Sequence, residues 1–341
     1  MRRELRCLAP SDKPRFEVRN QPIAPPKGQQ VLVRIEATSV NPIDAKRAAG
    51  YGQRLLALKG AGGFPLTLGN DLSGRVEAVG PGVVNFKPGQ RVFGLLPTGR
   101  PGGAHASHAL LPESLLRVAP EGIESSELAV LPYSFTTLWL AVQSTRLQRG
   151  NARGKRVLVH GAAGALGRLA LQLLSNWGCH IAAVCDRGRA ENCRALGAHE
   201  VIERGVNVIS TLPNDFDVVL NFANWDDELA LASRLAPDAL GHATTVHPLL
   251  GHFDRLGWIK GAMASRRDKA LVSAAVQARA PTGQYHWTIF KPDPGALDEL
   301  AAGLNERRYG LPVGLTVPFE QAHAAFQHVS AGKFGRAVLR P

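Results

Sequence analysis

Three evenly spaced glycines stand where a strand-like run gives way to a helix-like one. They are Gly161, Gly164 and Gly167. The run 157–160 before them is rich in β-favouring residues, and the run 168–177 after them has helical apolar spacing and no proline. Such a turn lets the backbone approach a pyrophosphate closely and points the first N–H groups of the helix at it. The pattern predicts a dinucleotide site, although a glycine turn between any strand and helix would look the same.

The context of the turn favours binding. Its spacing differs from the common Gly-x-Gly-x-x-Gly, because Ala163 stands near the place of the second glycine. A second strand candidate, 180–184, follows where a βαβ unit needs it, and Asp186, Arg187 and Arg189 come soon after that strand. The residues that we expect to hold the cofactor's pyrophosphate are Gly161, Ala163, Gly164, Ala165, Leu166 and Gly167.

The composition is that of a folded protein with a substantial core, since 45% of the 341 residues are hydrophobic and 20% are charged. No apolar run approaches the roughly 18 residues that span a bilayer, and no secretory signal or clear mitochondrial leader begins the chain. The formal net charge is +12, but the basic residues are scattered and their densest cluster, 265–269, lacks aromatic residues. We expect a cytoplasmic protein with a solvated basic surface, no membrane span and no nucleic-acid ligand.

The cysteines give no sign of a metal site. They are Cys7, Cys179, Cys185 and Cys193, and none forms a Cys-x-x-Cys pair. Their spacing suggests buried thiols rather than disulfides. His105 and His108 are too isolated to be proposed as ligands, so no metal is expected.

The pattern of elements changes twice along the chain. Residues 1–124 contain short β segments broken by glycine and proline, including 31–37, 72–80 and 91–95. From 125 to 291 helices alternate with apolar strands, which is typical of a doubly wound parallel sheet. The segment 292–341 is mixed again. We therefore predict an α/β protein in which 125–291 is inserted between 1–124 and 292–341.

Short motifs that resemble one known family occur over nearly the whole chain. They lie at 39–44 (SVNPID), 64–74 (FPLTLGNDLSG), 86–89 (FKPG), 131–133 (LPY), 137–139 (TLW) and in the glycine turn. Together they resemble the medium-chain dehydrogenase/reductase superfamily. The similarity is strongest to its zinc-free quinone oxidoreductase group and, through 253–257 (FDRLG), to the reticulon-interacting-protein-like branch of that group.

This resemblance implies a GroES-like β-rich partial barrel and a Rossmann domain, with the cofactor in the cleft between them. It also implies NADPH as the hydride donor, quinones or electron-poor alkenes as substrates, and a homodimer. By family position, Thr137 would touch the nicotinamide and Phe222 would contact the cofactor. The branch also allows a location in the mitochondrial matrix.

Two departures from the family pattern matter. Zinc-dependent relatives carry Cys near position 39 and Gly-His-Glu near 69–71, whereas this chain has Ser39 and Gly-Asn-Asp. Without a zinc Lewis acid, reduction of an already polarised quinone or alkene is easier than oxidation of an alcohol. The family also has Asp-x-x-Gly-Gly after the fourth Rossmann strand, and here 221–225 reads Asn-Phe-Ala-Asn-Trp. Trp225 is bulky where glycine lets the chain pass close to the cofactor.

NADPH is favoured over NADH as the cofactor. Counting back from Gly197, the position that holds an acidic residue in NAD-selective folds is Val184. By resemblance, two basic family positions are matched by Arg189 and Arg336, and a family tyrosine position near the adenosine phosphate is matched by Arg204. Arginine suits a ribose 2′-phosphate because it forms charge-assisted hydrogen bonds. Asp186 would repel that phosphate unless Arg187 or Arg189 pairs with it.

Hydride transfer depends more on geometry than on a strong acid or base. Asn41 could hydrogen-bond the nicotinamide ribose or the substrate oxygen, and Asp44 would brace its loop. The candidate proton donors are Tyr133, His247 and water; His247 lies at a strand end, where α/β sheets bind ligands.

Two functions remain open. The first is a zinc-independent, NADPH-dependent oxidoreductase that transfers a hydride to a quinone or activated alkene. The alternative is an NADP(H)-binding redox sensor or interaction protein with little turnover, which could also bind RNA; Asn224, Trp225 and the charge of +12 motivate it.

Overall fold

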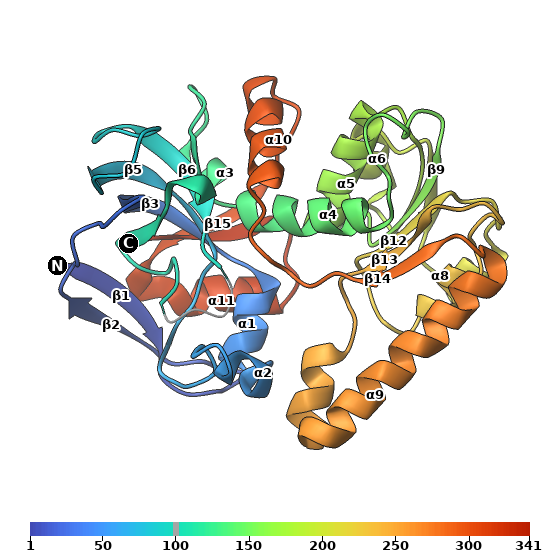
Figure 1. Cartoon of the computed structure of the whole chain (residues 1–341), viewed down its shortest axis with the longest axis horizontal. Coiled ribbons are helices and arrows are strands. Elements are labelled where there is room, and N and C mark those ends of the chain that lie inside the picture. Colours follow the sequence, from blue (N-terminus) through green and yellow to red (C-terminus); the bar gives the residue numbers. More distant parts are fainter. Residues whose placement is uncertain (98–101) are drawn as a thin grey trace. The chain divides into compact units, whose positions relative to one another are not determined.

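The computed structural model describes residues 1–97 and 102–341, which divide into two compact units (Figure 1). Unit 1 comprises Met1–Thr136 and Lys291–Pro341, and unit 2 comprises Thr137–Phe290. The sequence placed the boundaries at 124/125 and 291/292. The structural division therefore gives α3 (Ser125–Leu128) and the start of α4 (Pro132–Ser144) to unit 1. The predicted limits of the functional domains stay a prediction.

Unit 1 is built on a seven-stranded sheet in the order β15-β16-β3-β5-β6-β8, with β7 also paired to β3. Its strands are β3 (Gln30–Val40), β5 (Asp71–Val79), β6 (Arg91–Leu95), β7 (His108–Pro112), β8 (Leu116–Val118), β15 (Val313–Pro318) and β16 (Arg336–Arg340). The three β segments expected at 31–37, 72–80 and 91–95 are thus confirmed as β3, β5 and β6. Neighbouring strands are antiparallel except for β15 and β16.

A smaller sheet and a set of helices complete unit 1. The sheet has the order β2-β1-β4, with β1 at Arg2–Cys7, β2 at Phe16–Gln21 and β4 at Leu66–Thr67. The helices are α1 (Pro42–Ala48), α2 (Gln53–Ala57), α10 (Pro294–Asn305) and α11 (Ala322–Ser330). Phe319 and Phe326 pack in a buried cluster with Leu5, Val40 and Leu339, which joins the last helix to both sheets.

Unit 2 is a six-stranded parallel sheet in the order β11-β10-β9-β12-β13-β14. Its strands are β9 (Arg156–His160), β10 (His180–Cys185), β11 (Glu200–Glu203), β12 (Val218–Asn221), β13 (Gly241–Thr244) and β14 (Gln284–Trp287). Numbered from β9, this is the doubly wound order 3-2-1-4-5-6, in which ligands bind at the carboxyl ends of the strands where the order reverses. The predicted Rossmann fold is confirmed, and the reversal lies between β9 and β12.

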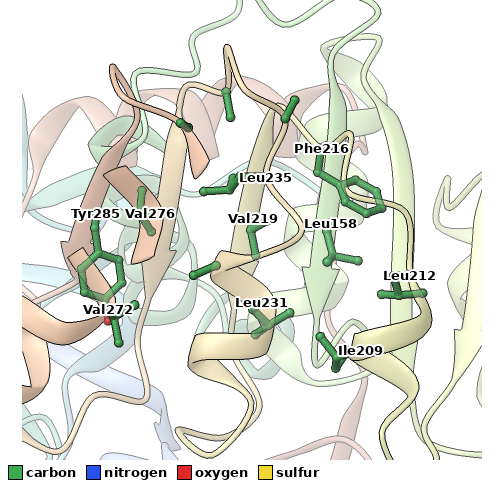
Figure 2. Packing of buried hydrophobic residues seen from close by; sticks show 14 of the residues in the cluster. Leu158, Ile209, Leu212, Phe216, Val219, Leu231, Leu235, Val272, Val276 and Tyr285 are labelled. Atoms are coloured by element: carbon green, nitrogen blue, oxygen red, sulfur yellow. The ribbon is translucent and has the colours of Figure 1, made fainter. Parts of the chain in front are cut away.

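Helices cover the sheet of unit 2 and fix its core. They are α5 (Ala165–Asn176), α6 (Ala190–Ala195), α7 (Val208–Thr211), α8 (Glu228–Ala232) and α9 (Leu249–Arg279). Figure 2 shows how Leu158 and Val219, from neighbouring strands, pack with Leu231 of α8 and Val272 and Val276 of α9. This apolar layer holds the strand ends that carry the candidate site.

The 31-residue helix α9 is the largest element that the sequence pattern did not predict. Gly257 has φ 77° and ψ −169°, so the chain turns back there and the element is two helices joined at a kink. In the described part of the chain, no helix is both long and apolar enough to cross a membrane.

Candidate functional site

The glycine turn after β9 is fixed by its hydrogen bonds to β10. The N–H groups of Gly161 and Ala162 donate to the carbonyl of Val184 at 3.1 and 3.0 Å. Gly161 has φ +83°, a conformation that L side chains rarely adopt. A Cβ at Gly161 would also lie 3.1 Å from the Ala223 nitrogen, so the turn and the loop after β12 lie against each other.

Gly167 brings α5 against the turn. A Cβ at this position would lie 2.3 Å from the carbonyl oxygen of Gly161 and 2.5 Å from Cα of Ala162, both backbone atoms. The N-cap residue Gly164 gives no side-chain acceptor to the first N–H groups of α5. An anion placed there would supply that acceptor and would meet the positive end of the helix dipole. The turn therefore fits a pyrophosphate held by the predicted backbone positions.

The loop after β12 is shaped by Asn221. Its Oδ1 accepts the N–H of Ala223 at 3.1 Å, and its Nδ2 donates to the carbonyl of Asn224 at 2.7 Å. The Phe222 N–H donates to the carbonyl of His160 at 2.9 Å, which places Phe222 beside the glycine turn.

Trp225 faces the interior of unit 2. Its ring packs edge-to-face on Trp287, with centroids 5.5 Å apart, and belongs to the shell of the hydrophobic core. The loop thus accommodates the bulky residue by directing the indole into the core. The effect of Trp225 on the cofactor contacts of this loop stays a prediction.

Arg204 joins two acidic side chains at the carboxyl edge of the sheet. Its guanidinium lies 3.9 Å from Asp186, which directly follows β10, and 3.7 Å from Asp227. Asp227 also lies 3.4 Å from Nε2 of His160, a buried imidazole whose pKa burial lowers to about 4. The partner of Asp186 is therefore Arg204, where the sequence suggested Arg187 or Arg189.

Arg204, Asp227 and His160 border a pocket of about 440 Å³ in unit 2, and Asp186 is not among its lining residues. His160, Arg204, Asn224 and Asp227 contribute polar groups, and the segment 205–210 forms another wall. Arg187 is exposed directly after Asp186, and Arg189 is the N-cap residue of α6. Val184 is buried in the core, so the side chain at the end of β10 that can meet a ribose belongs to Asp186.

A buried polar cluster supports the loop from below. Glu228, 1% exposed, accepts hydrogen bonds from the side chains of Asn221 and Tyr285, and its Oε1 lies 3.2 Å from Nε2 of His242. Trp287 donates to the Tyr285 hydroxyl at 2.8 Å. Burial raises the pKa of Glu228 to about 7 and lowers that of His242 to about 3. Below about pH 7 the proton of this pair therefore resides on the carboxyl group.

His247 follows β13 and is held by its neighbours. Its Nε2 lies 3.1 Å from the carbonyl of Thr288, and its ring stacks on Trp287 with centroids 4.9 Å apart. Since a carbonyl only accepts, Nε2 carries the proton and Nδ1 is the acceptor. Burial lowers the pKa of His247 to about 4, so the ring is neutral at pH 7. Its role as proton donor stays a prediction.

In unit 1 a buried carboxylate organises the candidate catalytic residues. Asp71 accepts hydrogen bonds from Ser39 Oγ at 2.6 Å, from Asn41 Nδ2 at 2.7 Å and from the N–H of Tyr133. Burial raises the pKa of Asp71 to about 6, against the effect of these donors. Oδ1 of Asn41 is wholly buried and accepts no hydrogen bond from the described residues. It is therefore an acceptor that a ligand hydroxyl or amide could satisfy.

Arg336 lies in this cluster. Its Nη2 donates to Ser134 Oγ at 2.7 Å. The negative charges of Asp71 and Asp44 attract its buried guanidinium. Asp44 accepts from the N–H groups of Asn41 and Gly69, so it braces the loop as expected. Arg336 thus belongs to unit 1 and Arg204 to unit 2, and a phosphate contact by Arg336 stays a prediction.

Two further residues complete the placement. Thr137 is buried on α4 as the first residue of unit 2, and its contact with a nicotinamide stays a prediction. Burial and the nearby carboxylates raise the pKa of the Tyr133 hydroxyl, which therefore keeps its proton.

Among residues 1–97 and 102–341 no three His, Cys, Asp or Glu side chains gather as a metal site. The expectation that the protein works without zinc stays a prediction.

Sequence reasoning missed Asp71 and Glu228 as organising groups. Asp71 was visible only as the third residue of Gly69-Asn70-Asp71, where it marked the absence of a zinc motif. Glu228 had no local signal, because its partners come from β12, β13 and β14.

Comparisons with known proteins agree with this architecture. Residues 27–121 match the family model of the alcohol dehydrogenase GroES-like domain. The NAD(P)H oxidoreductase RTN4IP1, mitochondrial, of Danio rerio is 31% identical over 317 residues, which cover 89% of this chain and 81% of that protein. The chloroplast envelope quinone oxidoreductase homolog of Arabidopsis thaliana is 32% identical over 209 residues, covering 60% of this chain and 62% of the relative.

A solved structure gives the same fold. The quinone oxidoreductase from Coxiella burnetii matches with a TM-score of 0.79 at 19% identity, over 100% of this chain and 99% of that one. A protein with this fold and these relatives is an oxidoreductase that uses a nicotinamide cofactor. The chain belongs to the medium-chain dehydrogenase/reductase superfamily, in its zinc-free quinone oxidoreductase group.

Proposed function

We propose that this protein is a zinc-independent reductase that uses NADPH to transfer a hydride to a quinone or an activated alkene. The observation that carries the proposal is the glycine turn of unit 2, where Gly167 leaves no space for a Cβ and the first turn of α5 has no side-chain cap. The names of the relatives, which are an NAD(P)H oxidoreductase and a quinone oxidoreductase homolog, support the reaction type.

Arg204 supports the choice of NADPH. The sequence count gave Val184 as the position that meets the ribose, but Val184 is buried and Asp186 is the first exposed side chain after β10. An acidic group there favours the unphosphorylated ribose, but Arg204 lies 3.9 Å from Asp186. The guanidinium is half-exposed and is shared with Asp227 at 3.7 Å, so it is available to a third, stronger anion. A ribose 2′-phosphate offers that anion through charge-assisted hydrogen bonds. Arg187 and Arg189 would add positive charge beside it.

In unit 1 the proposed roles rest on the Asp71 cluster. Asp71 fixes the amide of Asn41 so that Oδ1 presents an acceptor, which suits a hydroxyl of the ribose or of the reduced substrate. A bound nicotinamide supplies the hydride. The raised pKa of Tyr133 means that its hydroxyl keeps its proton and is a weak acid, and the Nε2 proton of His247 faces the carbonyl of Thr288. The candidate proton donors therefore stay Tyr133, His247 and water.

The donor set in unit 1 supports zinc independence. Ser39 uses its hydroxyl proton on Asp71, and Asp71 receives three donors from the protein. Asn70 donates its amide to the carbonyl of Leu96 at 3.1 Å. A hydroxyl and an amide are poor zinc ligands beside thiolate and imidazole. A quinone or an electron-poor alkene is already electrophilic and needs no Lewis acid.

The first test is a titration of the purified protein with NADPH and with NADH, followed by nicotinamide fluorescence. NADPH should bind at least about tenfold more tightly, a difference of about 1.4 kcal/mol. A turnover screen over quinones and enones then tests the reaction. A preference for NADH would refute the role of Arg204, and tight binding without turnover would favour the alternative of a redox sensor.

The predictions on assembly and location are separate from this reaction. A homodimer is expected from the resemblance and is tested by light scattering. The Danio rerio relative is named as mitochondrial. The cytoplasmic location expected from the sequence stays a prediction. The sequence also predicts that the protein binds no nucleic acid, whereas the alternative function allows RNA binding. Salt-dependent retention on RNA would decide between these two predictions.

A further inference from the structure

The N-terminal half of α9 extends beyond the core of unit 2. The buried side chains that α9 gives to this core, Val272 and Val276, come from its C-terminal part. Figure 1 shows the chain folding back at the other end of α9, where Gly257 interrupts the helix. The segment 249–269, here named the α9 hairpin, therefore consists of a short helix packed on the start of a long one.

Contacts within the α9 hairpin hold its two parts together. A Cβ at Gly261 would lie 2.9 Å from the carbonyl oxygen of His252, so the two backbones are in close contact. His252 lies 3.2 Å from Ser265 Oγ through Nδ1 and 3.4 Å from Asp268 through Nε2. Phe253 and Trp258 meet edge-to-face with centroids 5.7 Å apart. The hairpin is thus a preformed structure.

The outer face of the α9 hairpin is apolar. Ile259 and Met263 are four residues apart on one helical face and are 77% and 65% exposed. Leu256 and Trp258, at the turn beside them, are each 45% exposed. Single exposed apolar residues are normal, but four large ones on one preformed turn indicate a contact surface.

Exposed basic residues accompany this apolar face along the same segment of the sequence. Arg255, Lys260, Arg266, Arg267 and Lys269 lie within the same segment, against the acidic Asp254 and Asp268. Asp268 is already engaged by Arg267 at 2.9 Å and faces His252. The surface therefore carries an excess of positive charge on a chain whose formal net charge is +12.

We propose that the α9 hairpin attaches the protein to an anionic membrane surface. Leu256, Trp258, Ile259 and Met263 would enter the boundary between headgroups and acyl chains, while Lys260 and Arg266 would meet the anionic headgroups. A second copy of this chain would bring two positive surfaces together, which makes it the poorer partner. The proposal is independent of the proposed function, because it concerns a surface outside the glycine turn and the Asp71 cluster.

The test is flotation of the full chain with lipid vesicles. Vesicles of phosphatidylcholine with roughly 30 mol % phosphatidylglycerol should bind it, and pure phosphatidylcholine should bind it much less. Ile259→Ser/Met263→Ser and, separately, Lys260→Gln/Arg266→Gln should each lower the partition coefficient about tenfold or more. The matched control is Leu58→Ser/Val84→Ser, which removes two apolar side chains of similar exposure, 72% and 83%, from unit 1 and should bind as the unaltered protein does.

A second measurement locates the contact. Brominated acyl chains should quench tryptophan emission, and Trp258→Phe should abolish most of that quenching. Absence of binding, equal binding by all variants, or sensitivity to the charge variant alone would overturn the proposal. So would a concentration-dependent dimer that Ile259→Ser/Met263→Ser dissociates in the absence of vesicle binding, because the face would then join two copies.

Discussion

Substitution of Glu228 by glutamine tests whether the loop after β12 rests on a protonated carboxyl group. The side chain is 1% exposed and accepts hydrogen bonds from Asn221 and Tyr285. Its Oε1 also lies 3.2 Å from Nε2 of His242, and neither ring nitrogen of that histidine has another hydrogen bond among the described residues. A protonated Glu228 can donate to this nitrogen from Oε1, which also accepts the Tyr285 hydroxyl. A glutamine amide nitrogen in that place can also donate to His242 but cannot accept from Tyr285, and this loss does not depend on pH.

The size and sign of the effect follow from the pKa of Glu228. Burial raises the pKa from an ordinary value of 4.5 to about 7. Between pH 4.5 and pH 7 the folded protein holds a proton on Glu228 that the unfolded chain releases. The contribution of Glu228 to the unfolding free energy is therefore complete below pH 4.5 and is lost as the pH rises to 7. At 1.36 kcal/mol for each pH unit, the loss amounts to about 3 kcal/mol. Glu228→Gln removes this dependence because the amide does not titrate.

The assay is equilibrium unfolding by urea at pH values from 5 to 8, for the unaltered protein and for Glu228→Gln. The difference in unfolding free energy between the two should grow in favour of the variant by about 1.4 kcal/mol for each pH unit up to pH 7 and then level off. His160 and His247 change the unfolding free energy with pH in the opposite direction. Because their pKa values are lowered to about 4, they stabilise the fold increasingly as the pH rises from 4 to 6.5. The comparison of the two proteins cancels this contribution, since both contain these histidines. Glu121→Gln, at an exposed position, is the control and should show no trend.

A pH-independent difference would refute the reasoning, because Glu228 would then have the same pKa in the folded and unfolded states. A difference that grows toward low pH would show that the carboxylate is stabilised in its charged form. In that case His242 would carry the proton, and the pair would be an ion pair inside the sheet.

Three further substitutions test the candidate site. Gly167→Ala should lower the unfolding free energy by about 1–3 kcal/mol in the same urea titration, because its Cβ would lie 2.3 Å from the Gly161 carbonyl oxygen. The control is Gly164→Ala, whose Cβ would lie 3.3 Å from that oxygen and which should change the unfolding free energy by less than about 1 kcal/mol. Arg204→Gln should weaken NADPH binding about tenfold and NADH binding much less by fluorescence titration, and an equal loss for both would contradict a phosphate contact. Asn41→Ala should lower kcat/KM for a quinone about tenfold while the Kd of NADPH measured without substrate changes less; an unchanged kcat/KM would remove Asn41 from the reaction.

Elements with a strong local signal could be predicted from the sequence. The apolar runs at 157–160 and 180–184, which form β9 and β10, carry their information within a few residues. The start of α10 has a local signal of the same kind, an N-cap aspartate, Asp293, followed by Pro294. The Asp293 side chain accepts the N–H of Ala296 at 2.9 Å, as an N-cap does. Such signals depend on no distant part of the chain, so reading them required no knowledge of the fold.

Elements fixed by distant partners were misjudged or missed. The start of α4 at Pro132 has no local signal, because the Asp71 carboxylate from β5 accepts the N–H of Tyr133 and caps the helix. The pairing of Asp186 with Arg204 was also not predicted, since it joins loops after two different strands. The α9 hairpin was missed because its packing depends on the special backbone of Gly257.

The departure at residues 221–225 is best understood through Glu228. The resemblance predicts an aspartate at position 221, but an aspartate there would face the carboxyl group of Glu228 in a buried site, and two buried acids in contact cannot both ionise. Asn221 avoids this conflict because its Nδ2 donates to Glu228 while its Oδ1 accepts from Ala223. Its amide also holds the carbonyl of Asn224, so the loop keeps its course beside Gly161 while Trp225 turns into the core. Asn221 and Glu228 therefore form a matched pair, and Trp225 is joined to them by the Glu228 N–H, which donates to its carbonyl, and through the chain of contacts Trp287, Tyr285 and Glu228.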